Sequence, residues 1–252
     1  MTADEYLVSV VSKYRLATGP ESPAYKAAGE LCPIIREWAN KFLLEIAFAG
    51  SYAKGTGVRG STDVDLFISV DPDTPGTLRD IYENLDAWLR AKGYASRPQN
   101  VSIGLRYSEL RVDLIPARKQ RGNTSDHSLY RRKAQTWTQT NIATHISKIK
   151  DSGRIDEIKA TKIWRNLNRL DFPSFYLELT VLDALYGKNK NQPATNFHVV
   201  LEYLRDKFPG ARVVDPANSS NIISDDLIAS EKAAISNASK DTLGKSLEKI
   251  IW

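Results

Sequence analysis

Two carboxylates stand two residues apart in the stretch Ala49–Val70, AGSYAKGTGVRGSTDVDLFISV. Apolar residues alternate with Asp63 and Asp65, which is the pattern of a strand that buries one face. Because residues i and i+2 of a strand point to the same side, the two carboxylates should project together, about 7 Å apart along the chain. Hard oxygen ligands of this kind suit Mg²⁺ or Mn²⁺ bound against substrate phosphates.

A glycine-serine turn precedes these carboxylates. Gly50 and Ser51 follow an apolar run, and glycines permit positive φ and close approach of the backbone. The backbone N–H groups and the Ser51 hydroxyl can therefore face an anion such as a triphosphate. The simpler alternative is a hairpin with two surface aspartates.

A third carboxylate, Asp113, lies in the run LRVDLIPA. Val112 and Leu114 flank it, so the same alternation turns Asp113 away from the apolar face. Alone it would be a solvated charge at a strand edge. Together, three carboxylates from two strands have the composition of a two-metal site for phosphoryl transfer.

A glycine-serine turn, about a dozen further residues, an Asp-x-Asp strand and a third strand Asp resemble the DNA polymerase β-like nucleotidyltransferase superfamily. Within it the sequence resembles the branch of 2′-5′-oligoadenylate synthetases, archaeal CCA-adding enzymes and cGAS/DncV-like nucleotidyltransferases (CD-NTases). The resemblance implies an α+β fold, with a mixed-sheet catalytic lobe and a helical C-terminal lobe around an NTP. It also implies two Mg²⁺ or Mn²⁺ ions on Asp63, Asp65 and Asp113, the last also deprotonating the attacking hydroxyl.

The C-terminal half is similar to the same family. The runs TWTQTNIATHISKI, EIKATKIWRNL and PSFYLELTVLDAL resemble its helical blocks, and VVDPANSSNII resembles its late Asp-Pro segment. By this resemblance Lys162 and Ser174 match the lysine and serine that bind the donor triphosphate, beside Gly50 and Ser51. Lys159, one turn earlier, is the alternative lysine, and an exposed structural lysine is the simpler interpretation of either.

Hydrophobic periodicity predicts the elements that position these residues. We expect residues 1–120 to form the catalytic lobe and residues 121–252 the helical lobe. The basic segment Arg118–Lys133 is expected to be a loop at their boundary and a possible RNA contact. The remaining helices are expected at residues 3–16, 22–42, 77–92, 140–149, 155–170, 174–187 and 195–208 and beyond 224, and the strands at 43–49, 63–70, 101–107 and 110–117.

Composition narrows the chemistry. The chain has 252 residues, a formal net charge of +5 and a pI of about 9.1, which favours a polyanionic partner. Cys32 is the single cysteine and there are three histidines, so the sequence offers almost no ligands for a zinc site. The lone cysteine and the acidic N-terminus, which does not resemble a signal peptide, predict a cytoplasmic protein without membrane contact.

The function expected from these features is NTP-dependent synthesis of a short cyclic or linear oligonucleotide second messenger, as in antiphage signalling. The alternative is nucleotide addition to an RNA or tRNA 3′ end, although the sequence shows no appended RNA-binding domain. A lesser alternative is a non-catalytic RNA-binding module. The sequence assigns no base-selecting residues.

Overall fold

The computed structural model describes residues 1–60 and 63–252 and divides into two compact units. The sheet unit comprises Ala17–Ala53 and Thr62–Ile146. The helical unit comprises Met1–Leu16, Lys54–Ser61 and Ser147–Trp252. The chain therefore begins in the helical unit, leaves it for the sheet unit and returns twice.

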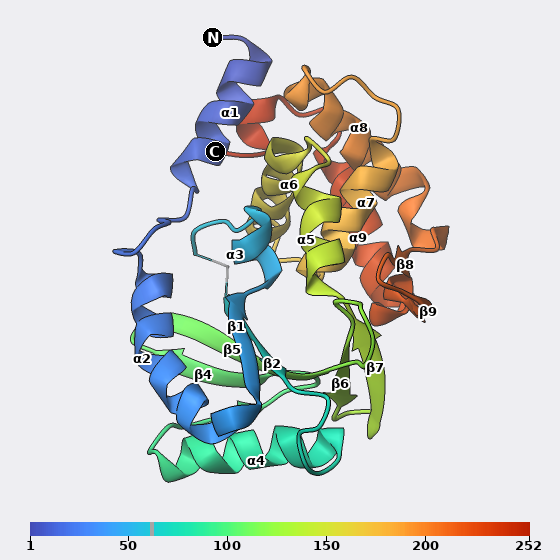
Figure 1. Ribbon diagram of the computed structural model, residues 1–252. Coiled ribbons are helices and arrows are strands. Elements are labelled where there is room, and N and C mark those ends of the chain that lie inside the picture. Colours follow the sequence, from blue (N-terminus) through green and yellow to red (C-terminus); the bar gives the residue numbers. More distant parts are fainter. Residues whose placement is uncertain (61–62) are drawn as a thin grey trace. The chain divides into compact units, whose positions relative to one another are not determined.

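The sheet unit is built on one mixed sheet (Figure 1). Its main path runs β1-β2-β5-β4-β3, and β6 and β7 extend it from β5. β2 and β5 are parallel, while the other neighbouring strands are antiparallel. The strands are β1 (Leu43–Phe48), β2 (Val64–Val70), β3 (Arg97–Pro98), β4 (Ile103–Tyr107), β5 (Leu110–Lys119), β6 (His127–Arg131) and β7 (Thr136–Thr140).

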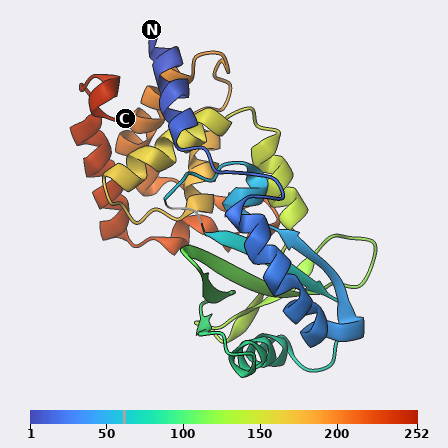
Figure 2. The same ribbon diagram turned by 90° about the vertical axis from the view of Figure 1, so that its left-hand side faces the viewer.

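Two amphipathic helices, α2 (Pro23–Ala39) and α4 (Leu78–Ala91), cover one face of this sheet (Figures 1 and 2). Ser22 and Thr77 begin them, each accepting a hydrogen bond from a backbone N–H of the first turn. Their apolar stripes bury the inward-facing strand residues, including Leu66 and Leu114. The alternate strand residues, among them the aspartates, are left on the other face.

The short helix α3 (Gly50–Lys54) follows β1, where a turn was expected. β1 lies at the edge of the sheet and not in its core, with Leu44 48% exposed. The prediction of a loop over Arg118–Lys133 was wrong at both ends. β5 continues to Lys119, and His127–Arg131 form β6, which pairs with the end of β5 and buries Leu129 and Tyr130.

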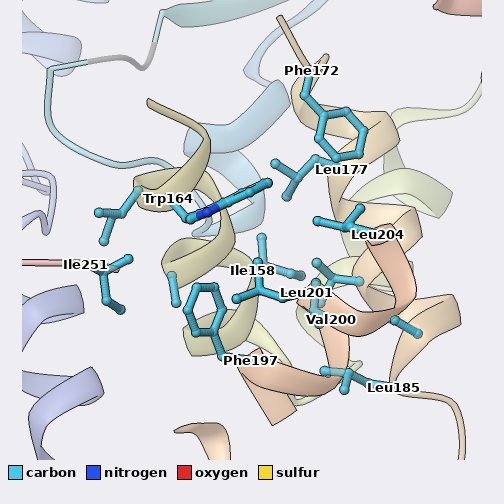
Figure 3. Close-up of a cluster of buried hydrophobic side chains, with 14 of the residues drawn as sticks. Ile158, Trp164, Phe172, Leu177, Leu185, Phe197, Val200, Leu201, Leu204 and Ile251 are labelled. Atoms are coloured by element: carbon cyan, nitrogen blue, oxygen red, sulfur yellow. The ribbon is translucent and has the colours of Figure 1, made fainter. Parts of the chain in front are cut away.

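The helical unit packs around Trp164, Phe172, Phe197 and neighbouring aliphatic side chains (Figure 3). A small antiparallel hairpin, which periodicity did not predict, interrupts its helices. The elements are α1 (Ala3–Lys13), α6 (Ile155–Leu167), α7 (Ser174–Ala184), α8 (Pro193–Asp206), β8 (Val214–Asp215), β9 (Asn218–Ile222) and α9 (Ala229–Thr242), with short 3-10 turns at 208–210, 223–226 and 247–249. A further 3-10 turn, at 40–42, belongs to the sheet unit.

Two expectations for this half need correction. TWTQT is strand β7 and not part of a helix; the helix α5 (Ile142–Lys150) begins after it. Lys162 was expected on the exposed face of α6, yet it is 1% exposed.

The units also divide the chain differently from the expected lobes. The sheet unit continues to residue 146, and α1 belongs to the helical unit, so the units are not the contiguous halves 1–120 and 121–252. Among the described residues, no helix is both long and apolar enough to cross a membrane.

Candidate active site

Asp65 on β2 and Asp113 on β5 lie directly opposite each other in the parallel pairing of these strands. Their neighbours Val64, Val112 and Leu114 are at most 3% exposed and pack toward α2 and α4. Strand alternation therefore turns both carboxylates toward the opposite face. The sequence predicted this shared direction for Asp63 with Asp65, and the parallel register adds Asp113.

The carboxylate of Asp113 accepts two side-chain hydrogen bonds. Gln99 Nε2 donates to Oδ1 at 2.8 Å, and Ser102 Oγ donates to Oδ2 at 3.1 Å. Tyr82 fixes this short loop by donating to the backbone carbonyls of Gln99 and Ser102. Burial raises the pKa of Asp113 and the nearby charge of Asp63 adds to the rise, while the hydrogen bond from Ser102 opposes it.

Asp63 immediately precedes β2 and is half-buried. Burial raises the pKa of its carboxyl, and the guanidinium of Arg111 acts in the opposite direction. Arg111 stands two residues before Asp113 on β5, so both face the same side of the sheet. Asp63, Asp113 and Arg111 thus form one electrostatic group.

Gly50 begins α3 with φ of +54°, a conformation that favours glycine. A Cβ at this position would overlap the carboxylate of Asp65. The neighbouring Ala49 N–H donates to the Asp65 backbone carbonyl at 2.9 Å, and Ser51 is 9% exposed. The glycine-serine segment therefore lies against the Asp65 carboxylate, while its contact with a triphosphate stays a prediction.

The donor set of Asp63, Asp65 and Asp113 consists of carboxylate oxygens, which fits Mg²⁺ or Mn²⁺. Gly50 leaves room for the backbone beside Asp65. In the part of the chain that the structure describes, however, no three His, Cys, Asp or Glu side chains are already arranged to hold a metal ion. The chemistry of the carboxylates fits these ions. That the three carboxylates converge on bound metal ions stays a prediction.

Lys162 and Ser174, the residues predicted to bind the triphosphate, belong to the helical unit. Lys162 Nζ donates to Glu178 Oε1 at 2.6 Å and to Thr56 Oγ1 at 3.1 Å. Ser174 Oγ accepts a hydrogen bond of 3.2 Å from Arg165. The alternative lysine, Lys159, is half-buried on the same helix.

A second lysine that sequence reasoning missed shares the carboxylate of Glu178. Lys54 forms an ion pair with Glu178 Oε2, and its ammonium lies 4.5 Å from the centroid of the Phe175 ring. Burial lowers the pKa of Lys162 to about 8, although Glu178 acts to raise it. The two lysines carry one positive charge more than Glu178 neutralises.

The hydrogen-bond partners of Asp113 were also missed. Gln99 and Ser102 lie in the irregular segment before β4, where no periodic signal marks their role. Arg111 had a signal, because it stands two residues before Asp113 on a predicted strand. The sequence signal for Lys54 was weaker: Lys54 stands four residues after Gly50 in the same motif.

The mixed sheet, the carboxylates paired across β2 and β5, and the glycine-serine segment after β1 define a polymerase β-like nucleotidyltransferase fold. Residues 30–152 match the family model of SMODS, the Second Messenger Oligonucleotide or Dinucleotide Synthetase domain. This match covers just under half of the chain, and it agrees with the resemblance to the cGAS/DncV-like nucleotidyltransferases seen in its motifs.

Two curated relatives share part of their sequence with this chain. A CCA-adding enzyme of Thermococcus kodakarensis is 30% identical over 127 residues, which cover 46% of this chain and 27% of that protein. A cyclic AMP-AMP-AMP synthase of Escherichia coli is 25% identical over 155 residues, covering 56% of this chain and 48% of that protein. The chain thus matches about a quarter and about half of their lengths.

A solved structure shows the fold over most of the chain. The ATP complex of CdnC from Escherichia coli MS115-1 superposes with a TM-score of 0.75 at 20% identity, covering 94% of this chain and 89% of CdnC. The likeness therefore includes the helical unit, which lies largely outside the SMODS match.

Proposed function

We propose that this protein is a metal-dependent nucleotidyltransferase that joins NTPs into a short cyclic or linear oligonucleotide second messenger. The observation that carries the proposal is the opposed pair of Asp65 and Asp113, on the sheet face away from the covering helices, inside the segment that matches the SMODS domain. The cyclic AMP-AMP-AMP synthase supports the choice of product class.

The reaction replaces one bond to phosphorus with another. A ribose hydroxyl oxygen of the acceptor bonds to the α-phosphorus of the donor NTP, and the bond from that phosphorus to the β-phosphate bridging oxygen breaks, which releases pyrophosphate. Asp113 accepts the hydroxyl proton. Catalysis then rests mainly on positioning and on neutralising charge.

Asp63, Asp65 and Asp113 would hold the two Mg²⁺ or Mn²⁺ ions. When bound, such ions stabilise the charge on the attacking and leaving oxygens. Gly50 lets the backbone lie against Asp65. Its neighbour Ser51 offers a hydroxyl to the triphosphate.

Lys162 and Ser174 are the further residues proposed to bind the donor triphosphate. Lys54 and Lys162, which both pair with Glu178, supply ammonium groups of the kind that bind phosphate. Lys162 already donates a hydrogen bond to Glu178. To bind the triphosphate, its ammonium would have to donate to a phosphate oxygen as well as to Glu178, or in place of it. Lys159 stays the alternative.

Incubation with labelled NTPs and Mg²⁺ or Mn²⁺, with and without total RNA, tests the proposal. We expect a small phosphatase-resistant product from NTPs alone if the product is cyclic, and a ladder of short oligonucleotides if it is linear. Failure to consume any NTP with either ion would contradict the proposal and favour a non-catalytic RNA-binding module.

A second candidate is nucleotide addition to an RNA 3′ end, favoured by the 30% identity with the CCA-adding enzyme. The basic segment Arg118–Lys133 would then contact RNA phosphates. Each phosphate neutralised on single-stranded RNA would add about 0.7 to the slope of log affinity against log salt. Lengthening of a labelled tRNA at its 3′ end, with no small product from NTPs alone, would favour this candidate.

A further inference from the structure

A polar pocket of about 810 Å³ lies beside Asp113, entirely within the sheet unit. Its lining combines Asp63 and Asp113 with four cationic side chains, those of Arg97, Arg106, Arg111 and Lys133. Its volume is in the range of small-molecule sites. The excess of cations over carboxylates favours an anionic ligand.

Strand pairing brings the arginines together. Arg106 on β4 and Arg111 on β5 lie directly opposite each other, and two like charges in this position repel. Arg97 on β3 pairs with Gly104, which pairs in turn with Asp113. Arg97 and Asp113 thus lie on either side of Gly104 in one row across the sheet, and the arginine pair occupies the next row on the same face.

Among the residues that the structure describes, none of these four cations forms a close ion pair, although Arg111 interacts electrostatically with Asp63 and Asp113. In the described part of the chain, no ion pair within 4.0 Å involves Arg97, Arg106, Arg111 or Lys133. Some exposed arginines of this unit do form such ion pairs: Arg79 binds Glu83, and Arg90 binds Asp86. The four cations that line the pocket therefore leave positive charge available to a ligand.

The pocket floor is open toward Asp113. A Cβ on Gly104 would lie 2.5 Å from Gln99 Nε2 and 3.2 Å from Asp113 Oδ1, so only glycine leaves this approach clear. On the other side, the backbone N–H groups of Arg132 and Lys133 donate to Asn100, which fixes the tip of the β6–β7 hairpin at the pocket.

We propose that this pocket selects the acceptor by its 5′-triphosphate. The inference rests on the proposed function, since Asp113 must receive the acceptor's hydroxyl proton. An acceptor with its hydroxyl at Asp113 would extend its phosphates along the arginine rows, where guanidinium groups form paired hydrogen bonds to phosphate. A free NTP, or a linear intermediate that keeps its 5′-triphosphate, offers several charges to these cations. An internal nucleotide at an RNA 3′ end offers one phosphodiester.

Binding of inorganic tripolyphosphate tests the anion site without turnover. Calorimetry in EDTA compares wild type, the double variant Arg97→Gln/Arg106→Gln and the control Arg79→Gln/Arg90→Gln. We expect the first double variant to bind at least tenfold more weakly, while the control stays near wild type. Equal affinity in wild type and Arg97→Gln/Arg106→Gln would overturn the site.

Acceptor kinetics test the assignment. With the donor NTP saturating, wild type should prefer a triphosphorylated acceptor over the corresponding nucleoside, and Arg97→Gln/Arg106→Gln should lose this preference through a higher KM for the triphosphate. If Arg97→Gln/Arg106→Gln kept the preference for the triphosphorylated acceptor, the assignment would be overturned. It would also be overturned if the variant used an RNA with a 5′-hydroxyl more weakly as acceptor but used NTP acceptors as wild type does. If wild type consumes no NTP, the proposed function fails, while tripolyphosphate binding still decides whether the anion site exists.

Discussion

Lys162 donates a 2.6 Å hydrogen bond to Glu178 within the helical unit, and both side chains are at most 1% exposed. Lys54 pairs with the other oxygen of the same carboxylate. One buried negative charge therefore holds two buried positive charges, and the folded state depends on it more than on an exposed ion pair.

Replacing Glu178 with Gln should destabilise the protein by about 3–5 kcal/mol, because two buried ammonium groups lose their counter-charge. Urea unfolding at neutral pH measures this change. The matched control is Glu83→Gln, which removes the carboxylate that Arg79 binds on the surface of α4 and should cost less than about 1 kcal/mol. Similar free energies of unfolding for wild type and Glu178→Gln would contradict the argument.

The pH dependence follows from Lys162. Its pKa is lowered to about 8 in the folded protein, while an unfolded lysine has a pKa near ~10.4. Between these values the unfolded state binds more protons, so this group makes stability rise with pH across that window. Unfolding free energies at pH 7.5, 9 and 10 should show this contribution in wild type relative to Lys162→Met, and parallel curves would exclude it.

Asp65→Asn and Asp113→Asn should each reduce NTP turnover at least about a hundredfold, since each removes a charge from the proposed metal-binding group. Thermal stability should not fall, because neighbouring carboxylates repel one another in the metal-free protein. Turnover assays with Mg²⁺ and Mn²⁺, paired with thermal melts, check both parts. Near-wild-type turnover in either variant would remove that residue from the site.

Gly50→Ala should lower both turnover and stability, because the new Cβ overlaps Asp65 and the φ of +54° disfavours alanine. The stability cost should be about 1–3 kcal/mol. Gly93→Ala is the control: its φ is +87° and nothing lies within 4 Å of its Cβ, so it shares the backbone strain without the overlap. Loss of activity in Gly50→Ala but not in Gly93→Ala would identify the contact with Asp65 as the cause.

Lys162→Ala should weaken NTP binding by roughly 1.5–3 kcal/mol, the contribution of a charge-assisted hydrogen bond. Ser51→Ala should have a smaller effect, since a hydroxyl carries no charge. Calorimetry with a non-hydrolysable NTP and Mg²⁺ measures both, with Lys159→Ala in parallel. A loss in Lys159→Ala and none in Lys162→Ala would move the role one turn along α6.

The elements that carry the aspartates were predictable because local patterns determine them. The alternation around Asp65 and Asp113 depends only on which strand residues are buried, and the amphipathic stripe of α4 is equally local. The parallel register that sets Asp65 opposite Asp113 is a long-range pairing, which a single sequence does not encode in any local period.

Burial of charged side chains was the least predictable feature. Lys162 stands on a face of α6 that the periodic pattern assigned to solvent, and its burial depends on Glu178 from α7 and Thr56 from a distant loop. The grouping of Arg97, Arg106 and Arg111 likewise follows from strand pairing and not from spacing in the sequence. Both the burial of Lys162 and the grouping of the arginines therefore depend on contacts between residues that are distant in sequence.

The path of the chain has a consequence for synthesis on the ribosome. α1 packs against the core of the helical unit, and Tyr6 donates a hydrogen bond of 3.0 Å to the carbonyl of Ile251. The native contacts of α1 therefore cannot be complete until Ile251 has been made, whereas every strand of the sheet has been made by residue 140. Contacts so distant in sequence close slowly, so the nascent chain should carry a folded sheet while α1 is still without its partner.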